Sequence, residues 1–407
     1  MTSHYTRNNG TRVVLILLAV FIAGYAVTLT TFGLHRPCWH DECHFVETIR
    51  LFISDPSLST LRHYNEMSTP LPFILYAAWG TVFGDSLVSL RLLSVIIAVI
   101  TICAYFYFFL KELGRPTAAL FLTVFLALNP YMAGASIFVF TDMLAMLFLV
   151  LLCFAIRNRS PGLSFVASAA GLLCRQYFLF VVIASVAYCV WCFFLQKKRR
   201  DVFTAAGLAA GIIPLVALFF LWKGFCPVNE YRMRYMNDAF VFHPNSVTLY
   251  GLQLFVYMLP VIYCFWKPLY LNRRRLIIAL VASCSYWIFP VAVSAPGVAA
   301  GKFTVGYFHR LLRIWPGESM EHIVFFICFM FALPIFISII SDTWRRLISR
   351  ETDFTLFLDF LIISFFIIMP FSYLHWEKYF LPMVPIVALQ LWTSPRTSIQ
   401  KPVSQQT

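Results

Sequence analysis

Charged residues are scarce in this 407-residue chain, making up only 12% of it against 60% hydrophobic residues. A soluble globular protein is about half apolar and about a quarter charged, so this composition excludes a soluble enzyme, a disordered protein and a disulfide-stapled secreted module. The apolar runs lack the period-two alternation of a transmembrane β-barrel. We find no internal repeat, which argues against a transporter built from inverted repeats. What remains is an all-α, polytopic integral membrane protein.

Long apolar segments fill most of the chain. A spanning helix needs about 20 mostly apolar residues, so the length admits roughly a dozen spans and no large soluble domain. Residues 34–87 are expected to form the first outer loop, with juxtamembrane helices such as one at 45–53, and residues 394–407 a cytoplasmic tail. We predict a single transmembrane domain of residues 1–407 with twelve spans at about 13–33, 88–110, 117–134, 141–156, 162–175, 177–195, 202–222, 247–266, 276–298, 320–341, 354–373 and 379–393.

Basic residues are unevenly distributed between the two sets of loops. The N-terminus and the loops that follow every second predicted span hold 19 of the 31 Lys and Arg residues. By the positive-inside rule these loops face the cytoplasm, so the net charge of +13 reflects topology and does not require a nucleic-acid partner. Acids, most histidines and the two longest loops, 34–87 and 223–246, lie on the other side. We expect the chemistry on that face, in the periplasm or lumen, with the protein in a bacterial inner membrane or the endoplasmic reticulum membrane.

The densest group of polar residues directly follows the first predicted span and includes Asp41, Glu42 and His44. An acidic pair at a membrane surface is costly unless it is solvated or functional. The residues alone leave three interpretations open: a solvated start of the loop, a metal site, and a catalytic carboxylate at the mouth of a membrane cavity. The spacing matches no standard zinc pattern. A catalytic carboxylate here would act as general base on an acceptor hydroxyl.

Further short motifs follow this acidic group in order along the chain. They are a polar segment that ends in prolines at 62–72, Phe-Gly-Asp at 83–85, Arg-Leu-Leu-Ser at 91–94, Asn-Pro-Tyr at 129–131, Phe-Thr-Asp at 140–142, Arg-Gln at 175–176 and His-Trp-Glu-Lys-Tyr at 375–379.

This series resembles the C-type glycosyltransferases, which use polyprenyl-phosphate sugars and include the protein mannosyltransferases and the aminoarabinose transferases of lipid A. Within that superfamily, the motifs at 41–44, 69–72, 141–142 and 175–176 are similar to those of the dolichyl-phosphate-glucose α-1,2-glucosyltransferases. The His here comes two residues after Glu42 where that subgroup is expected to have three, and Asp142 stands where it tends to have Glu. The superfamily resemblance is therefore stronger than the resemblance to one sugar specificity.

The resemblance implies inverting transfer of a hexose from a dolichyl or undecaprenyl phosphate to an acceptor hydroxyl on a glycan, lipid or protein. It places the general base at Asp41, with Glu42 as its neighbour or substitute. Asp142 would bind the acceptor or orient the base. No cofactor is required beyond the lipid-linked sugar as co-substrate, and the scheme leaves room for a bound divalent metal.

Cations near the headgroup plane would hold the donor phosphate, and Arg suits this role through its bidentate fork. For Arg175 in its apolar run, snorkelling to the interface is the alternative. We expect phosphate contacts from Arg175, Arg310, Arg313 and Lys378, and substrate contacts from His44, His63, Tyr64, Thr69, Gln176, His375 and Tyr379.

A multi-pass transporter or flippase of a lipid-linked sugar or other amphiphile is the main alternative function. Such a protein would place polar residues near the middle of the membrane, at interrupted helices. Most acids here lie in the predicted outer loops instead, which favours the enzyme.

Overall fold

The structure is a computed structural model that describes residues 2–39, 41–230, 232, 240–299, 301–372 and 374–394, with the backbone alone for 2–10 and 296. The tail predicted at 394–407 lies outside the described residues from 395 onward. Helices account for 79% of the structure, and the described ranges contain no strand. The protein is therefore all-α. The chain divides into two compact units, which are residues 1–182 with 199–234 and residues 183–198 with 235–407.

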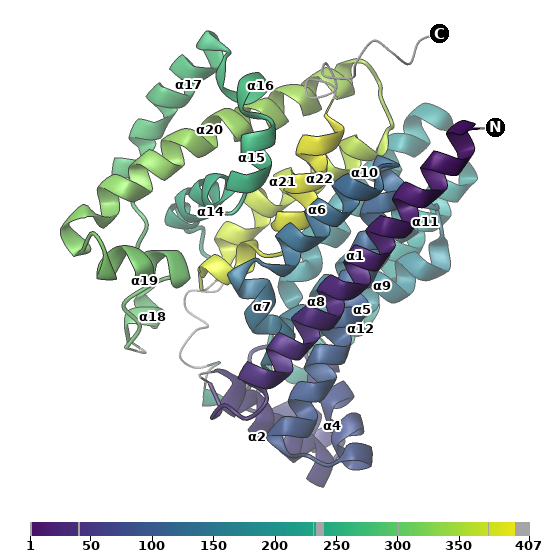
Figure 1. The fold of residues 1–407 in the computed structure, drawn as a ribbon. Helices are drawn as coiled ribbons and strands as arrows, with labels where there is room; N and C mark the ends of the chain where they lie inside the picture. The colour runs from purple at the N-terminus through teal and green to yellow at the C-terminus, as the bar shows by residue number, and fades with distance from the viewer. Residues whose placement is uncertain are drawn as a thin grey trace. The chain divides into compact units, whose positions relative to one another are not determined.

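The first unit contains the N-terminal half of the chain. Helices far apart in sequence pack together in it, because α5 contacts α1, α6, α7 and α8, and α9 contacts α8, α11 and α12. Figure 1 shows α2 and α4 beyond the C-terminal end of α1. The helices are α1 (Thr2–Gly33), α2 (Asp41–Ser54), α3 (Leu58–His63), α4 (Leu71–Phe83), α5 (Leu87–Leu113), α6 (Pro116–Ala127), α7 (Pro130–Ile137), α8 (Asp142–Arg157), α9 (Pro161–Cys174), η1 (Gln176–Phe178), α11 (Arg199–Ala210) and α12 (Ile213–Trp222).

The second unit is built around the long helix α20, on which α14 and α17 pack (Figure 1). Helix α10 (Leu179–Gln196) begins in the first unit and continues in the second. The remaining helices are α14 (Pro244–Val256), α15 (Leu259–Cys264), α16 (Trp266–Tyr270), α17 (Arg273–Ser283), η3 (Cys284–Trp287), α18 (Ala295–Ala299), α19 (Tyr307–Ile314), α20 (Glu318–Ile348), α21 (Phe354–Ile368), η4 (Met369–Phe371), η5 (Glu377–Phe380) and α22 (Met383–Thr393).

Six helical stretches in the described residues are long and apolar enough to cross a membrane: 11–33, 87–113, 176–196, 199–222, 318–348 and 354–371. Helices α6 and α7 make a seventh candidate if the pair, bent by 71°, counts as one span. The cause of the bend is local, because Pro130 begins α7 without an N–H and the Asn129 side chain caps it by accepting from the Tyr131 N–H. These stretches support a multi-pass membrane protein.

The prediction of twelve spans is not confirmed. The segments predicted at 141–156, 162–175 and 379–393 form helices of only 16, 14 and 11 residues, which are α8, α9 and α22. The segment predicted at 247–266 is divided between α14 and α15, where Pro260 stands near the start of the second helix. The segment at 276–298 stops being α-helical after Ser283. Hydropathy alone cannot detect the break between α14 and α15, since proline interrupts a helix without making it less apolar.

Candidate functional site

Arg91 of α5 pins the loop that leads from the first span to α2. Its side chain is fully buried and forms a bidentate pair with Glu42, with Nε–Oε1 at 2.9 Å and Nη2–Oε2 at 2.6 Å. Its Nη1 and Nη2 also donate to the backbone carbonyls of Gly33, Leu34, Arg36 and Pro37 at 2.6–3.1 Å. Nearly all of the guanidinium's donors are used, so this loop has one well-defined path.

Glu42 is committed to that structural role. Besides the two bonds from Arg91, its carboxylate accepts the Trp39 N–H at 3.1 Å and the Val139 N–H at 3.0 Å, and its side chain has 0% exposure. Four hydrogen-bond donors hold this buried carboxylate in place. The geometry therefore favours Glu42 as a positioning residue over Glu42 as a substitute base.

Asp41 begins α2 directly beside this anchored carboxylate and is half-buried. An acid in the first turn is favoured by the helix dipole. The start of α2 lies against the segment that leads to α8, because Glu42 binds Val139 and the rings of Phe45 and Phe140 meet edge to face at 6.1 Å between centroids. The structure thus brings the segment of Asp41 next to the segment of Asp142.

Asp142 is the first residue of α8 and pairs with Arg175, with an Nη2–Oδ2 distance of 2.8 Å. Both side chains are 10% exposed. The Tyr177 hydroxyl donates to the other carboxylate oxygen at 3.2 Å, and Arg175 Nη1 donates to Ser68 Oγ at 3.0 Å. Arg175 reaches this position because it stands in extended backbone between α9 and η1, not within a helix. The apolar run around Arg175 is therefore interrupted by a break between two helices, and Arg175 forms a buried ion pair at that break.

Three of the predicted substrate-binding residues bind backbone carbonyls of the first unit. Tyr64 donates to Ser68 O at 2.6 Å, Thr69 donates to Leu172 O at 3.0 Å, and Gln176 donates to Met67 O at 2.6 Å. Tyr64 and Thr69 are fully buried. These bonds hold the loop of Ser68 against Arg175, which is a supporting role. His44 and His63 are exposed.

The other five predicted site residues belong to the second unit. Arg313 forms ion pairs with Glu318 at 3.2 Å and with Glu321 at 3.0 Å. Arg310 is exposed, and Lys378 is half-buried. Arg313 is thus already paired with two carboxylates.

Burial lowers the pKa of two histidines of the second unit, His375 and His309. Burial and the nearby His243 lower the pKa of His375 to about 4. Burial also lowers the pKa of His309, although Glu321 opposes the effect. Because His375 is uncharged near neutral pH, it offers a substrate hydrogen bonding and no positive charge. Tyr379, the last predicted residue, is buried.

Residues without an assigned role in the sequence analysis turn out to organise both units. Glu377 is buried and accepts the N–H groups of Phe308 and His309 at the start of α19, both at 2.9 Å, and the Tyr257 hydroxyl at 2.9 Å. Arg91 in the first unit is likewise a buried charged side chain that binds several backbone groups. A signal for Arg91 was present, since an Arg inside an apolar helix is unusual. No sequence signal identified its partner.

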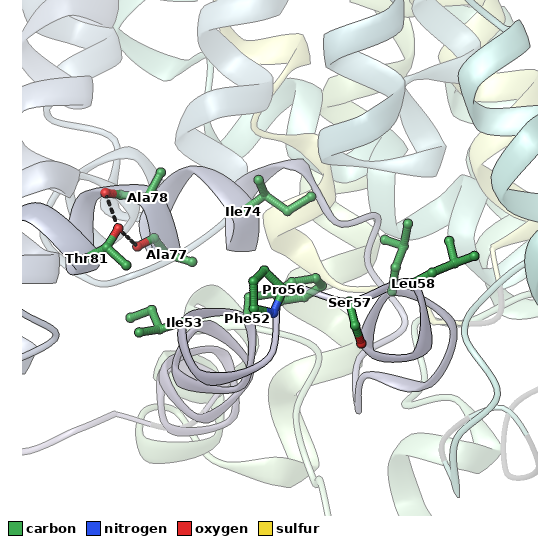
Figure 2. A pocket seen from close by; sticks show the side chains of 10 residues that line it. Phe52, Ile53, Pro56, Ser57, Leu58, Ile74, Ala77, Ala78 and Thr81 are labelled. Atoms are coloured by element: carbon green, nitrogen blue, oxygen red, sulfur yellow. Dashed lines mark hydrogen bonds between the residues drawn. The ribbon is translucent and has the colours of Figure 1, made fainter.

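An apolar groove of about 410 Å³ lies between α2, α3 and α4 (Figure 2). Its lining includes Phe52, Leu58 and Ile74. The Thr81 hydroxyl donates to carbonyls of its own helix. The Ser57 hydroxyl donates to Asp55. The groove therefore offers mainly apolar surface, and both of these hydroxyl groups already donate hydrogen bonds within the protein.

In the described part of the chain, no group of three or more His, Cys, Asp or Glu side chains is arranged to hold a metal ion. The acidic group after the first span is instead organised by Arg91. Comparisons with protein-family models, curated protein sequences and solved structures give no match to this chain.

Proposed function

We propose that the chain is a membrane glycosyltransferase that moves a hexose from a polyprenyl phosphate to an acceptor hydroxyl on the luminal or periplasmic face. The observation that carries the proposal is the pairing of two helix starts, Asp41 on α2 and Asp142 on α8, whose segments meet through the Glu42–Val139 bond. Each acid has a buried arginine close by, Arg91 through Glu42 and Arg175 directly. Carboxylates and cations at one place are what this transfer needs.

In the proposed reaction Asp41 removes the proton of the acceptor hydroxyl as its oxygen attacks the anomeric carbon of the sugar. The new carbon–oxygen bond forms while the bond from that carbon to the phosphate oxygen breaks. The electron pair leaves with the lipid phosphate, and the attack inverts the anomeric centre. A fixed cation stabilises the negative charge that grows on the leaving phosphate. We assign that part to Arg175, with Asp142 holding its guanidinium in place.

Arg175 provides a test of this assignment. Arg175→Ala is expected to weaken use of the lipid donor by at least about tenfold, because it removes a charge-assisted contact. Arg175→Lys is expected to restore only part of the loss, since an ammonium cannot form the bidentate fork. The measurement is the initial rate against donor concentration in detergent, with the thermal midpoint recorded for each variant. Arg50→Ala, which removes an arginine whose side chain is 52% exposed on α2, is the matched control. Full activity of Arg175→Ala would return this residue to a purely structural role.

Buried charges in candidate spans of the second unit favour one alternative, a transporter or flippase. Arg346 of α20 is 1% exposed and lies 3.8 Å from the fully buried Asp359 of α21, whose other contact is Gln390 of α22 at 3.0 Å. Ionisable residues within spans commonly mark transport pathways. They also join helices, which is the interpretation we favour here, because this cluster ties α20, α21 and α22 together.

A transfer assay separates the two functions. Membranes that contain the protein are supplied with a polyprenyl-phosphate-linked radiolabelled hexose, and label is followed into material that no longer carries the lipid phosphate. The glycosyltransferase predicts transfer that is lost in Asp41→Asn. The transporter predicts movement of intact donor across sealed vesicles with no transfer, equally in wild type and Asp41→Asn.

A further inference from the structure

A second cluster of positive charge lines a cavity in the first unit, apart from the Asp142–Arg175 pair. The cavity has a volume of about 570 Å³ and lies where α3 and α12 end. Its size is within the ~300–1,000 Å³ typical of small-molecule sites. The basic side chains that line it are Arg62, His63, Lys223 and Arg232.

The acids among the described residues leave this charge unbalanced. Among the described residues, none of these four side chains forms an ion pair with a carboxylate, and the lining of the cavity includes no Asp or Glu. Lys223 and His63 are exposed. Like charges gathered in one cavity repel one another, so such a cluster is stabilised when an anion enters.

Backbone carbonyls hold two of the cations in place without neutralising them. Arg62 Nε donates to Leu221 O at 3.1 Å, and Arg232 donates to Trp222 O at 2.7 Å and to Lys223 O at 2.6 Å. These carbonyls belong to the C-terminal end of α12, where cations are favoured by the helix dipole. Capping of α12 explains in part why Arg62 and Arg232 lie at this place. It does not account for Lys223 or His63, which bind none of these carbonyls.

The segment that carries Arg232 is itself anchored. Asn229 Oδ1 accepts the Arg232 N–H at 3.0 Å, and its amide donates to Tyr64 O at 2.9 Å and Glu66 O at 3.0 Å. The guanidinium lies over Gly224, where an added Cβ would come within 2.3 Å of Arg232 Nη2. The arginine is therefore preorganised, and Gly224 leaves room for it.

The cavity lies at the end of a candidate membrane span. The stretch 199–222 is long and apolar enough to cross a bilayer and ends at Trp222, next to Lys223. Phe220, two residues before that end, is 79% exposed, as a lipid-facing side chain would be. Basic residues directly beyond a span lie at the depth of lipid headgroups.

We propose that this cavity binds a phosphate group, with Arg62, Lys223 and Arg232 as its principal ligands. Guanidinium and ammonium groups that converge on a site next to the bilayer match the charge and the hydrogen-bond acceptors of phosphate. The phosphate comes either from a lipid headgroup or from free phosphate in solution. The inference concerns binding alone and does not depend on the transfer reaction.

The test measures binding to the purified full-length chain in two settings. In neutral detergent, inorganic phosphate is titrated and the thermal midpoint followed, since a ligand that binds the folded state stabilises it. In nanodiscs of phosphatidylcholine with and without phosphatidic acid, bound lipid is counted by native mass spectrometry. A response to inorganic phosphate identifies a free-anion site, and a response to phosphatidic acid alone identifies a headgroup site. Absence of both would overturn the proposal.

Variants locate the site. Arg62→Gln and Lys223→Asn are each expected to weaken binding by about tenfold or more, as loss of a charge-assisted contact does; Asn suits the left-handed backbone at Lys223, where φ is 50°. Arg50→Gln removes one positive charge from an exposed pair with Asp85 and should leave binding unchanged. Equal weakening by Arg50→Gln and Arg62→Gln would indicate non-specific attraction and overturn the site.

A glycine pair provides a variant that keeps every charge. Gly224→Ala is expected to displace the Arg232 guanidinium and weaken binding several-fold. The thermal midpoint of the unliganded protein should fall only slightly, because a side-chain end moves and its bonds to the Trp222 and Lys223 carbonyls are lost. Gly162→Ala, where an added Cβ meets nothing within 4 Å, is the matched control. Wild-type binding in Gly224→Ala, Arg62→Gln and Lys223→Asn alike would refute the assignment.

Discussion

Asp41→Asn is expected to lower turnover by at least about two orders of magnitude while protein level and donor binding stay nearly unchanged. Asparagine keeps the size and most hydrogen bonds of aspartate but cannot accept the proton of the acceptor hydroxyl. Loss of a general base typically costs about 10²–10⁴ in rate. The position also suits the role, because Asp41 follows directly on a loop that Arg91 holds in one path, and proton transfer needs a positioned group.

The experiment compares initial rates at saturating donor for Asp41→Asn and three further variants. Glu47→Gln is the matched control, since Glu47 lies exposed on α2 and its change should leave the rate within about twofold. Glu42→Gln is expected to reduce protein level or thermal midpoint more than the rate of the folded fraction. If Asp41→Asn is active and Asp142→Asn is inactive, the base is Asp142. If both are active, the proposed mechanism is wrong.

Arg91→Met is expected to destabilise the protein by about 3–5 kcal/mol, the cost typical of removing one partner from a buried ion pair. Glu42 would remain as an uncompensated charge with 0% exposure, and the carbonyls of the loop at 33–37 would lose their donor. The measurement is the thermal midpoint in detergent, together with the rate of proteolysis within residues 34–40.

Two further variants separate the ion pair from other effects of the substitution. Arg50→Ala breaks an exposed pair with Asp85, both 52% exposed, and should change stability by no more than about 1 kcal/mol. The double variant Arg91→Met with Glu42→Leu should be more stable than Arg91→Met alone, because it removes the unpaired charge. An effect of Arg91→Met as small as that of Arg50→Ala would show that the pair does not hold the loop.

Much of the membrane architecture follows from the sequence through apolar length. The stretches 11–33, 87–113, 318–348 and 354–371 lie close to predicted spans, since a long apolar run has few stable alternatives to a helix in a bilayer. The segment predicted at 247–266 was less well described, because proline and helix packing decide where a helix stops. The helix expected at 45–53 exists and is extended to Asp41–Ser54.

The residue types of the candidate site could also be selected from the sequence. Asp41, Asp142 and Arg175 are conspicuous because charged side chains are rare in an apolar chain and costly to place in a membrane. The sequence also placed Asp142 at the start of a span, where α8 begins, whereas Asp41 was expected in the loop before a helix at 45–53 and instead begins α2. What it did not reveal was which of these charges are already paired.

Composition and hydropathy are enough to show that the protein is helical and apolar, and which few charged residues need an explanation. The partners of those residues follow from the folded packing: Glu42 binds Arg91, 49 residues away, and Arg175 binds Asp142 and Ser68, 33 and 107 residues away. Hydropathy and helical periodicity report a residue's local surroundings and carry no information on distant pairing. The packing of α5 on α1 and of α9 on α8 brings these side chains together. Because they are buried, a charge that lost its partner there would be strongly destabilising.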